Sequence, residues 1–397
     1  FTNMDFCKNL YIQIRFCRRL ARIYYCQSVC AVYFLEVLQM KILILKVQTI
    51  GDTLLTTPLI SNLYRYYDNP AIDVIVNEGT SQMLSFNPNI NQIIEYKREL
   101  YRDLSNLQRL SKNIQLLKKI RQTKYDLVID LDEGDRGAFI TLISSAKIKI
   151  GSSAISSYFL RKAYTHLLSK RDNRHTVEIN LDPLRLLDIP TIDKKVDIFW
   201  NQEDDNFVEN KLTGIKQFIH IHPFSKGWFK DVNIQTITKI IDYCEQELNI
   251  KVVITAAPIQ RELDKLDDIL KPCQSKPINL GGRLTLKQTA ALNNKAKLFI
   301  GVDTAIMHIS AANNVPTLAF FGPTAPDTWG PWENDLEQAC YHRNGGLQVN
   351  CKHRVLSDVR TCLPCNNDGC DNNLVSDCLT ELDINVIKQN INEMIIQ

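Results

Sequence analysis

The stretch from residue 301 to residue 324 constrains the fold more than any other part of the chain. An apolar run ends at its first glycine, small residues then begin a helical stretch, and a second apolar run ends at a Gly-Pro pair. The order strand, turn, helix, strand is typical of an α/β domain. Asp303 and Thr304 precede the helix, where the first backbone N–H groups have no partner within the helix. The sequence therefore predicts an anion-binding helix start suited to a diphosphate, with His308 one turn further along the same face.

The sequence is equally consistent with a second interpretation of these polar residues. Asp303 or Thr304 would simply cap the helix, which is a common role for both residue types. His308 would then be a polar side chain packed inside the domain.

Strands and helices alternate through both halves of the chain. Strands are expected at 42–45, 72–76, 93–96, 125–131, 194–200, 218–222 and 251–255, and the first half also has helical stretches at 52–67 and 104–120. Such alternation predicts parallel, doubly wound sheets, in which ligands bind at the carboxyl ends of the strands. A polar stretch at 201–210 is a candidate connector or short helix between the two halves.

The composition excludes several classes of protein. With 397 residues, of which 45% are apolar and 23% charged, the chain is an ordinary globular protein long enough for two or three domains. The net charge is +3, and residues 1–39 hold five Lys/Arg and two Asp/Glu. The rest is therefore neutral on balance and gives no sign of nucleic-acid binding. No apolar run approaches the length of a transmembrane helix.

The first thirty-nine residues precede a stretch that resembles the start of a protein. The stretch Met40-Lys-Ile-Leu-Ile-Leu resembles a natural protein start, so we expect residues 1–39 to be an upstream extension. The alternative is a basic amphipathic segment at a membrane surface, since arginines are interspersed with aromatic residues there. No small-residue cleavage site follows a clean apolar core, which argues against a signal peptide.

Two polar loops follow strands of the first half. In the first, Gly51 permits a tight turn and Asp52 falls at the start of a helix, where an Asp N-cap is common. Spacing alone does not favour a catalytic role for Asp52 over a capping one. The second loop, 132–137, carries Asp135 and Arg136. These two side chains are able to grip sugar hydroxyls or phosphates, or to form a local ion pair in a solvent loop.

The second half offers further polar residues beyond its strands. Ser225, Lys226 and Lys230 follow the strand at 218–222, and Glu262 follows the strand at 251–255. Most surface lysines are only solvated, so the lysines alone are a weak indication of a phosphate site.

Half of the twelve cysteines lie between residues 340 and 378. Four of them have the spacing C-x2-C-x4-C-x7-C, which suits a tetrahedral zinc site, and these are Cys362, Cys365, Cys370 and Cys378. The alternative is a loop without metal. Its cysteines would be reduced, because a cytoplasmic chain is not expected to hold stable disulfides.

Two motifs together resemble glycosyltransferase family 9, the heptosyltransferases. One is D-[ST]-[GA]-x-x-H followed by F-G-P-[ST], matched from Asp303 to Thr324; the other is K-x-x-x-[IM]-G-D-x-[IVL]-x-x-[TL]-P, matched from Lys46 to Pro58. The loop Glu133-Gly-Asp-Arg-Gly-Ala is similar to that of the third core type of these enzymes. The stretch His175-Thr-Val-Glu-Ile-Asn is similar to a family helix with a structural or acceptor-side role.

The resemblance implies a GT-B architecture, with two Rossmann-like domains whose parallel sheets face a central cleft. We expect an acceptor-binding domain at 40–200, a linker at 201–214, and a nucleotide-sugar-binding domain at 215–339. A Cys-rich segment, 340–378, and a C-terminal helix, 379–397, would follow. In two-domain glycosyltransferases of this fold the final helix commonly crosses back to the first domain.

The resemblance also implies roles for individual residues. Asp52 would be the general base, and Asp135 and Arg136 would contact the acceptor. Lys230 is the expected phosphate-binding lysine, with Lys226 as the fallback, because the family's tryptophan two residues later is Val232 after Lys230 but Trp228 after Lys226. The remaining donor contacts implied are Ser225, Glu262 (to the ribose), Asp303, Thr304, Ala305 and His308.

The implied reaction is an inverting, metal-independent transfer of heptose from ADP-heptose to the inner core of lipopolysaccharide. No cofactor is needed for it, although a structural zinc fits the cysteines. The only Asp-x-Asp, at 130–132, lies in the acceptor half. A cytoplasmic location is expected, on the inner face of the inner membrane where the acceptor is made. Two alternatives stay open: a non-hydrolysing nucleotide-sugar epimerase, which shares the two-domain plan, and an inactive sugar-nucleotide-binding homologue.

Overall fold

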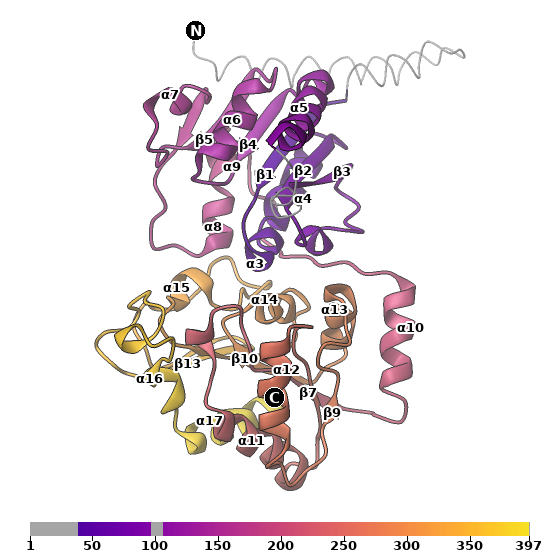
Figure 1. Cartoon of the computed structure of the whole chain (residues 1–397), viewed down its shortest axis with the longest axis vertical. Helices are drawn as coiled ribbons and strands as arrows, with labels where there is room; N and C mark the ends of the chain where they lie inside the picture. The colour runs from indigo at the N-terminus through magenta and orange to yellow at the C-terminus, as the bar shows by residue number, and fades with distance from the viewer. Residues whose placement is uncertain (1–38, 97–105, 397) are drawn as a thin grey trace.

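The structure is a computed structural model that describes residues 39–96 and 106–396 (Figure 1). The expected extension at 1–39 and its alternative as a membrane-surface segment lie outside these residues, apart from Gln39. The first two residues of the helix expected at 104–120 also lie outside them.

The first half is built on a sheet with the strand order β3-β2-β1-β4-β5-β6, and all of its neighbouring strands are parallel. Its strands are β1 (Lys41–Lys46), β2 (Ala71–Asn77), β3 (Gln92–Tyr96), β4 (Leu127–Asp130), β5 (Ile148–Ser152) and β6 (His166–Leu168). The two central strands, β1 and β4, have buried apolar interiors, as expected for a parallel sheet covered by helices, and charged residues stand only at their ends.

Helices cover both faces of this sheet (Figure 1). They are α3 (Ile50–Leu54), α4 (Thr57–Tyr66), η1 (Ser81–Met83), α5 (Asn106–Thr123), α6 (Asp135–Ile143), α7 (Tyr158–Arg161), α8 (Thr176–Asn180) and α9 (Asp182–Leu186). The helix expected at 52–67 is divided into α3 and α4. Pro58 lies in the first turn of α4, where its missing N–H costs no hydrogen bond.

The second half has a sheet with the order β12-β13-β11-β10-β7-β8-β9, in which only the β12–β13 pair of the described strands is antiparallel. Its strands are β7 (Phe218–His222), β8 (Lys251–Ile254), β9 (Ile278–Asn279), β10 (Leu298–Val302), β11 (Thr317–Phe321), β12 (Leu347–Asn350) and β13 (His353–Ser357). Without β12, the order of connections repeats that of the first sheet. Both halves are therefore doubly wound, as predicted.

The helices of the second half complete the fold. They are α10 (Gln202–Lys211), η2 (Trp228–Lys230), α11 (Ile234–Asp242), the π-helical η3 (Tyr243–Glu247), α12 (Gln260–Leu270), α13 (Leu286–Asn294), α14 (Ala305–Ala312), α15 (Pro326–Trp329), η4 (Cys370–Asn372), α16 (Asp377–Thr380) and α17 (Ile384–Ile396). The polar stretch after residue 200 is a helix, α10. A capping box between Asn201 and Asp204 fixes its start. Within the described residues, no helix is long and apolar enough to cross a bilayer.

Two expectations about the fold are wrong. The segment at 194–200 is not a strand, because the second half takes up its backbone groups. Trp332 Nε1 donates to the Lys194 carbonyl oxygen at 2.9 Å, and the Val196 N–H donates to Asn334 Oδ1 at 2.9 Å. The final helix, α17, does not pack on the first half. Its apolar face, which includes Ile387, is buried in the core of the second half.

The two halves meet through α3 and α14 (Figure 1). One apolar cluster runs across this contact and joins Leu54 and Leu55 to Ile306 and Met307. In each sheet the strand order reverses beside its first strand, between β1 and β4 and between β7 and β10. Ligands of open α/β sheets bind at such switch points. The loops that leave these four strands therefore carry the candidate site.

Candidate active site

Asp52 lies on α3, just beyond the carboxyl end of β1. Its side chain is buried, and Oδ2 accepts a 2.6 Å hydrogen bond from the Thr49 hydroxyl. The N-cap residue of α3 is Thr49, whose side chain makes no capping hydrogen bond. The interpretation of Asp52 as an N-cap is therefore wrong. Its other oxygen, Oδ1, lies 3.6 Å from Nζ of Lys46.

Lys46 places a buried ammonium group behind Asp52. It is the last residue of β1 and has no exposed surface. Burial lowers the pKa of Lys46, and the carboxylates of Asp52 and Asp132 oppose that shift. Asp132 Oδ2 accepts a 2.7 Å hydrogen bond from the Val47 N–H, and burial raises the pKa of Asp132 while Lys46 opposes it. The loops after β1 and β4 are thus held together at the switch point by this hydrogen bond and by the attraction between Lys46 and Asp132.

Asp130, at the end of β4, is a second buried acid in the first half. Its Oδ2 accepts a 2.5 Å hydrogen bond from the Tyr164 hydroxyl, and its Oδ1 accepts one from the Asp132 N–H. Burial, and next the charge of Asp132, raise the pKa of Asp130 to about 8. A Cβ at Gly137 would lie 2.0 Å from Asp130 Oδ2. The second glycine of the 132–137 loop is therefore needed for α6 to pass over this carboxyl group.

His308 brings the two halves together at the site. It is buried on α14, and a Cβ at Gly51 would lie 2.9 Å from its Cδ2 atom. Glycine at position 51 thus permits the close approach of α3 to α14. Burial lowers the pKa of His308, against the opposing charges of Asp303 and Asp52, so the ring is neutral at pH 7. Its Nδ1 atom is buried and has no hydrogen-bond partner among the described residues.

Lys230 and Asp303 form the charged pair of the second half. Lys230 Nζ donates to Asp303 Oδ2 at 2.6 Å, and the Thr324 hydroxyl donates to the same oxygen at 2.7 Å. The loops after β7, β10 and β11 are thereby held together. Thr304 is the N-cap residue of α14 but its side chain makes no capping bond, and Ala305 is the first helical residue. The capping interpretation of Asp303 and Thr304 is therefore wrong.

The other residues predicted to contact the donor differ in their burial. Ser225 is buried, and its hydroxyl donates to the Gly227 carbonyl oxygen at 2.7 Å. Lys226 is exposed and makes no contact with the pair formed by Lys230 and Asp303 within the described residues. Glu262 is buried in the first turn of α12 and accepts a 2.7 Å hydrogen bond from the Ala257 N–H. Of the two lysines considered, the structure brings only Lys230 to Asp303.

Asp135 and Arg136 lie in the first turn of α6, beside the switch point of the first sheet. Asp135 is exposed, and the Arg136 guanidinium lies 4.8 Å from the centre of the Tyr96 ring. Among the described residues the two form no ion pair with each other. The alternative of a local ion pair between Asp135 and Arg136 is therefore wrong, and Arg136 stacks on Tyr96 instead.

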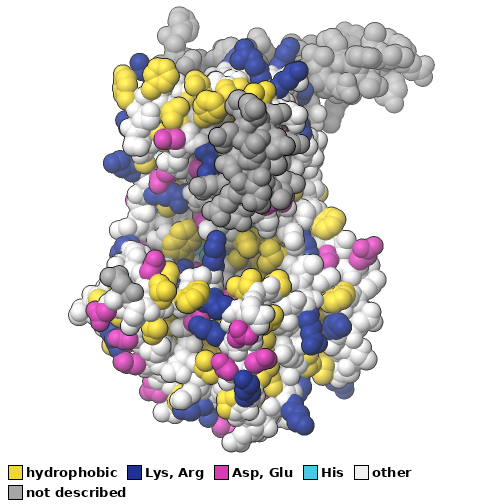
Figure 2. Space-filling model, in the orientation of Figure 1, with side chains coloured by type: hydrophobic (Ala, Val, Ile, Leu, Met, Phe, Trp, Pro, Cys, Tyr) yellow, Lys and Arg dark blue, Asp and Glu magenta, His cyan; other side chains and the backbone are white. Residues whose placement is uncertain are grey.

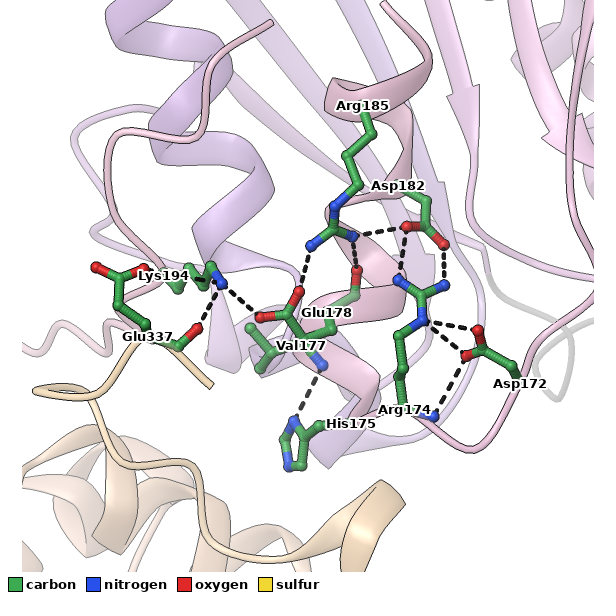
Figure 3. Close-up of polar contacts among 9 residues, drawn as sticks. All are labelled: Asp172, Arg174, His175, Val177, Glu178, Asp182, Arg185, Lys194 and Glu337. Atoms are coloured by element: carbon green, nitrogen blue, oxygen red, sulfur yellow. Dashed lines mark hydrogen bonds and ion pairs between the residues drawn. The ribbon is translucent and has the colours of Figure 1, made fainter. Parts of the chain in front are cut away.

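The stretch that begins at His175 ties the first half to the second. His175 caps α8 through a 3.2 Å bond from the Val177 N–H to Nδ1, and its Nε2 bonds the Gly330 carbonyl oxygen at 2.9 Å. Figure 3 shows Glu178 between Arg185 and Lys194, while Lys194 reaches Glu337 of the second half. Burial lowers the pKa of His175 to about 3. These contacts give the stretch a structural role.

The Cys-rich segment packs behind the second half of the site. Cys378 is buried, and a Cβ at Gly322 would lie 3.2 Å from its Sγ atom. The Asn366 N–H donates to the Pro323 carbonyl oxygen at 2.9 Å, one residue before Thr324. Burial raises the pKa of Cys378 to about 12, and the thiols at 370, 365 and 362 add to that effect. In the described part of the chain, however, no three His, Cys, Asp or Glu side chains are placed to hold a metal.

Sequence reasoning left several members of this site without a role. Lys46 was recognised as part of a motif, but nothing in the sequence shows that its ammonium group turns toward Asp52. Thr49 and Thr324 are the hydroxyl partners of Asp52 and Asp303, and threonine at such loops is too common to stand out. Asp132 carries a signal that could have been used, because it follows the strand that neighbours β1.

The fold and the site together define a class of protein. Two doubly wound domains meet at their switch points, with a carboxylate and a buried lysine on one side, and a lysine beside a helix start on the other. This is the architecture of a GT-B glycosyltransferase. The family model described as glycosyltransferase family 9 (heptosyltransferase) matches residues 113–355. The chain therefore belongs to glycosyltransferase family 9.

Individual relatives agree with this assignment. Lipopolysaccharide heptosyltransferase 3 of Escherichia coli is 32% identical over 294 residues, which cover 72% of this chain and 85% of that protein. Two solved structures share the fold. A family 9 glycosyltransferase from Veillonella parvula has a TM-score of 0.73 at 19% identity, covering 90% of this chain and 97% of its own. E. coli ADP-heptose LPS heptosyltransferase II has a TM-score of 0.69 at 18% identity, covering 90% and 99%.

Proposed function

We propose that this protein transfers heptose from ADP-heptose to a sugar of the lipopolysaccharide inner core, with inversion at the anomeric carbon. The observation that carries the proposal is the meeting of Asp52 and the Lys230–Asp303 pair across the contact between His308 and Gly51. The names of the E. coli relatives support the choice of donor and acceptor.

Asp52 is the general base in this proposal. Its Oδ2 is held by Thr49, which leaves Oδ1 for the acceptor hydroxyl. Oδ1 takes the hydroxyl proton while the acceptor oxygen forms a bond to the anomeric carbon of the donor. The bond from that carbon to the ADP oxygen breaks, and its electron pair leaves with ADP. One displacement from the face opposite the leaving group inverts the anomeric centre.

Lys230 and the start of α14 stabilise the departing ADP. Negative charge grows on the diphosphate in the transition state, and preorganised positive groups stabilise it most at that moment. Lys230 supplies a full positive charge, and the backbone N–H groups at the start of α14 supply a partial one. Asp303 holds Lys230 in place, and the Thr324 hydroxyl holds Asp303. His308 supports this arrangement as a neutral ring between the two carboxylates.

The proposed transfer uses no metal for catalysis. Lys230 and α14 supply the positive charge that a divalent cation provides in other transferases. The Asp-x-Asp sequence is in the first half, where Tyr164 and the Val47 N–H occupy oxygens of Asp130 and Asp132. Because the acceptor is built on lipid, we place the enzyme on the cytoplasmic side of the inner membrane.

One assay tests the proposal. Purified protein is given ADP-heptose, with and without a lipopolysaccharide core acceptor that lacks the terminal heptose, and ADP release is measured. We expect ADP to be released only with acceptor, together with a heptose-sized mass gain in the acceptor. Conversion of the sugar nucleotide without acceptor would instead indicate an epimerase. ADP binding with no turnover on any core acceptor would indicate an inactive binding homologue.

A further inference from the structure

A stretch of the first half differs in charge from the rest of the chain. Every charged residue from Arg136 to Arg171 is Lys or Arg, although the whole chain has a net charge of only +3. The basic residues are Arg136, Lys147, Lys149, Arg161, Lys162, Lys170 and Arg171. This stretch forms α6, α7, β5 and β6, at the side of the first half that carries the α7 label in Figure 1.

Large apolar side chains protrude from the same stretch. Tyr158 and Phe159 on α7 are 72% and 74% exposed, and Phe139 and Leu142 on α6 are also exposed. We call these four residues the α6–α7 face. Figure 2 shows hydrophobic and basic side chains next to each other over this part of the molecule, with acidic side chains nearby. Adjacent exposed aromatic residues on a monomer commonly mark a binding surface.

The core does not require these apolar residues. Leu160 is the α7 residue that packs inward, against a small cluster of Ala138, Ile155 and Tyr164. Ser157 caps the short helix, and Arg161 donates to the Ile155 carbonyl oxygen. The turn is therefore fixed without help from Tyr158 and Phe159. Folding alone gives no reason for two neighbouring aromatic rings to face solvent here.

Two lysines beside the face have no acidic partner among the described residues. Lys162 lies over the Tyr158 ring at 4.8 Å, and within the described residues neither Lys162 nor Lys170 forms an ion pair. The Lys149 ammonium group donates to the Leu142 carbonyl oxygen at 3.5 Å and forms no ion pair within the described residues. The stretch from Arg136 to Arg171 thus presents positive charge and apolar rings together and contains no carboxylate of its own, although Glu133 pairs with Arg171 at 3.7 Å.

We propose that the α6–α7 face binds an anionic lipid bilayer. Aromatic rings insert at the headgroup level, and lysines beside them are attracted to anionic headgroups. A protein partner would ordinarily meet a surface with charges of both signs. The proposal goes beyond the transfer reaction, since it concerns where the enzyme sits and does not depend on which sugar it moves.

The position of the face suits a lipid-linked acceptor. Helix α6 begins at Asp135, beside the switch point, and Leu142 lies seven residues further on. At 1.5 Å per residue the separation along the helix is about 10 Å. A bilayer against this face would present the sugars of a lipid acceptor within reach of Arg136, which stacks on Tyr96 at the end of β3.

Vesicle sedimentation with the full chain tests this inference. Vesicles of phosphatidylethanolamine with phosphatidylglycerol are compared with vesicles of phosphatidylcholine alone, at low and high salt. We expect binding to the anionic vesicles that weakens with salt. Replacing both Lys162 and Lys170 by Gln should lower the partition coefficient about 25-fold, since each cation near an anionic surface contributes about fivefold. The double substitution Tyr158→Ser with Phe159→Ser should lower it at least tenfold.

Matched controls come from the second half. Leu347→Ser with Val349→Ser removes two exposed apolar residues of β12, and Lys216→Gln with Lys239→Gln removes two exposed cations. Both control variants should bind as the unchanged protein does, and melting temperatures show that all variants fold. The inference is overturned if the unchanged protein ignores anionic vesicles. It is equally overturned if both α6–α7 variants bind normally, or if the controls lose as much binding as they do. ADP binding, measured in parallel, reports separately on the donor site.

Discussion

Lys46 Nζ lies 3.6 Å from Asp52 Oδ1, and within the described residues neither atom has a hydrogen-bond partner. Burying an ammonium group whose N–H groups have no hydrogen-bond acceptor costs free energy of folding, so its presence needs a reason. The reason offered by the geometry is electrostatic. Lys46 places a positive charge beside the carboxylate that must accept a proton from the acceptor.

The first prediction follows from this pair. Lys46→Met keeps the volume of the side chain but removes its charge. Asp52 then loses the positive charge that lies 3.6 Å from its Oδ1 atom, so kcat should fall. ADP affinity should change little, because Lys46 is in the half that does not bind the donor. Steady-state rates measure the effect, and an unchanged kcat in a variant that folds and binds ADP would show that Lys46 does not act on the base.

The second prediction separates the roles of Asp52 and Lys230. Asp52→Asn should lower kcat by about 10²–10⁴-fold, as loss of a general base does, with ADP binding nearly unchanged. Lys230→Ala should weaken ADP binding by roughly 1.5–3 kcal/mol, the usual range for a hydrogen bond to a charged group. Lys226→Ala is the matched control and should leave both quantities unaltered. Calorimetry with ADP and steady-state rates decide the matter. Normal turnover of Asp52→Asn with weakened ADP binding would assign the base elsewhere.

The third prediction concerns the contact between the two halves. Gly51→Ala places a Cβ 2.9 Å from His308 Cδ2, so we expect a loss of stability of about 1–3 kcal/mol and slower transfer. Gly134→Ala is the control, since its Cβ would meet no atom within 4 Å. His308→Ala removes the obstacle. In a double-mutant cycle, Gly51→Ala should therefore cost less in the His308→Ala background than alone. Equal costs in the two backgrounds would contradict the contact.

The parts of the structure that the sequence could predict are those governed by local patterns. Apolar runs predict the strands β1, β4, β7 and β10. The polar residues that follow these runs predict the site residues at the ends of the strands. What could not be predicted depends on contacts between distant segments. Residues 194–200 have the pattern of a strand, but Trp332 and Asn334 bind their backbone groups. The position of α17 likewise depends on a distant contact. Its residue Ile387 packs into the core of the second half, and the local sequence pattern does not show which half the helix packs against.

The fourth prediction uses the buried acid of β4. Burial raises the pKa of Asp130 to about 8 from an ordinary value of 3.8, so the folded protein holds a proton there that the unfolded chain has lost. Stability from this group is therefore complete below about pH 4 and falls as the pH rises toward 8. The slope is at most ~1.4 kcal/mol per pH unit. Asp130→Asn removes the proton linkage, so its free energy of unfolding should decline less between pH 5 and pH 8. Parallel curves for the two proteins, from urea unfolding, would contradict the assignment.

The last prediction concerns the zinc site proposed for the Cys-rich segment. Cys378 is buried against Gly322, and the thiols at 362, 365 and 370 are close enough to raise its pKa further, but they are not placed at ligand distances. Zinc would favour the thiolates and draw them together, since a closed site of four cysteines is tetrahedral.

We expect purified protein to contain about one zinc per chain, lost when Cys378 is replaced by Ser. The matched control is Cys351→Ser, because Cys351 is exposed and outside the four-cysteine spacing. Elemental analysis gives the metal content, and alkylation of the native protein gives the reactivity of each thiol. A metal-free protein whose thiols at 362, 365 and 370 react as fast as Cys351 would contradict the site. The segment would then be a loop of reduced cysteines, held to the donor loop through the contact of Asn366 with Pro323.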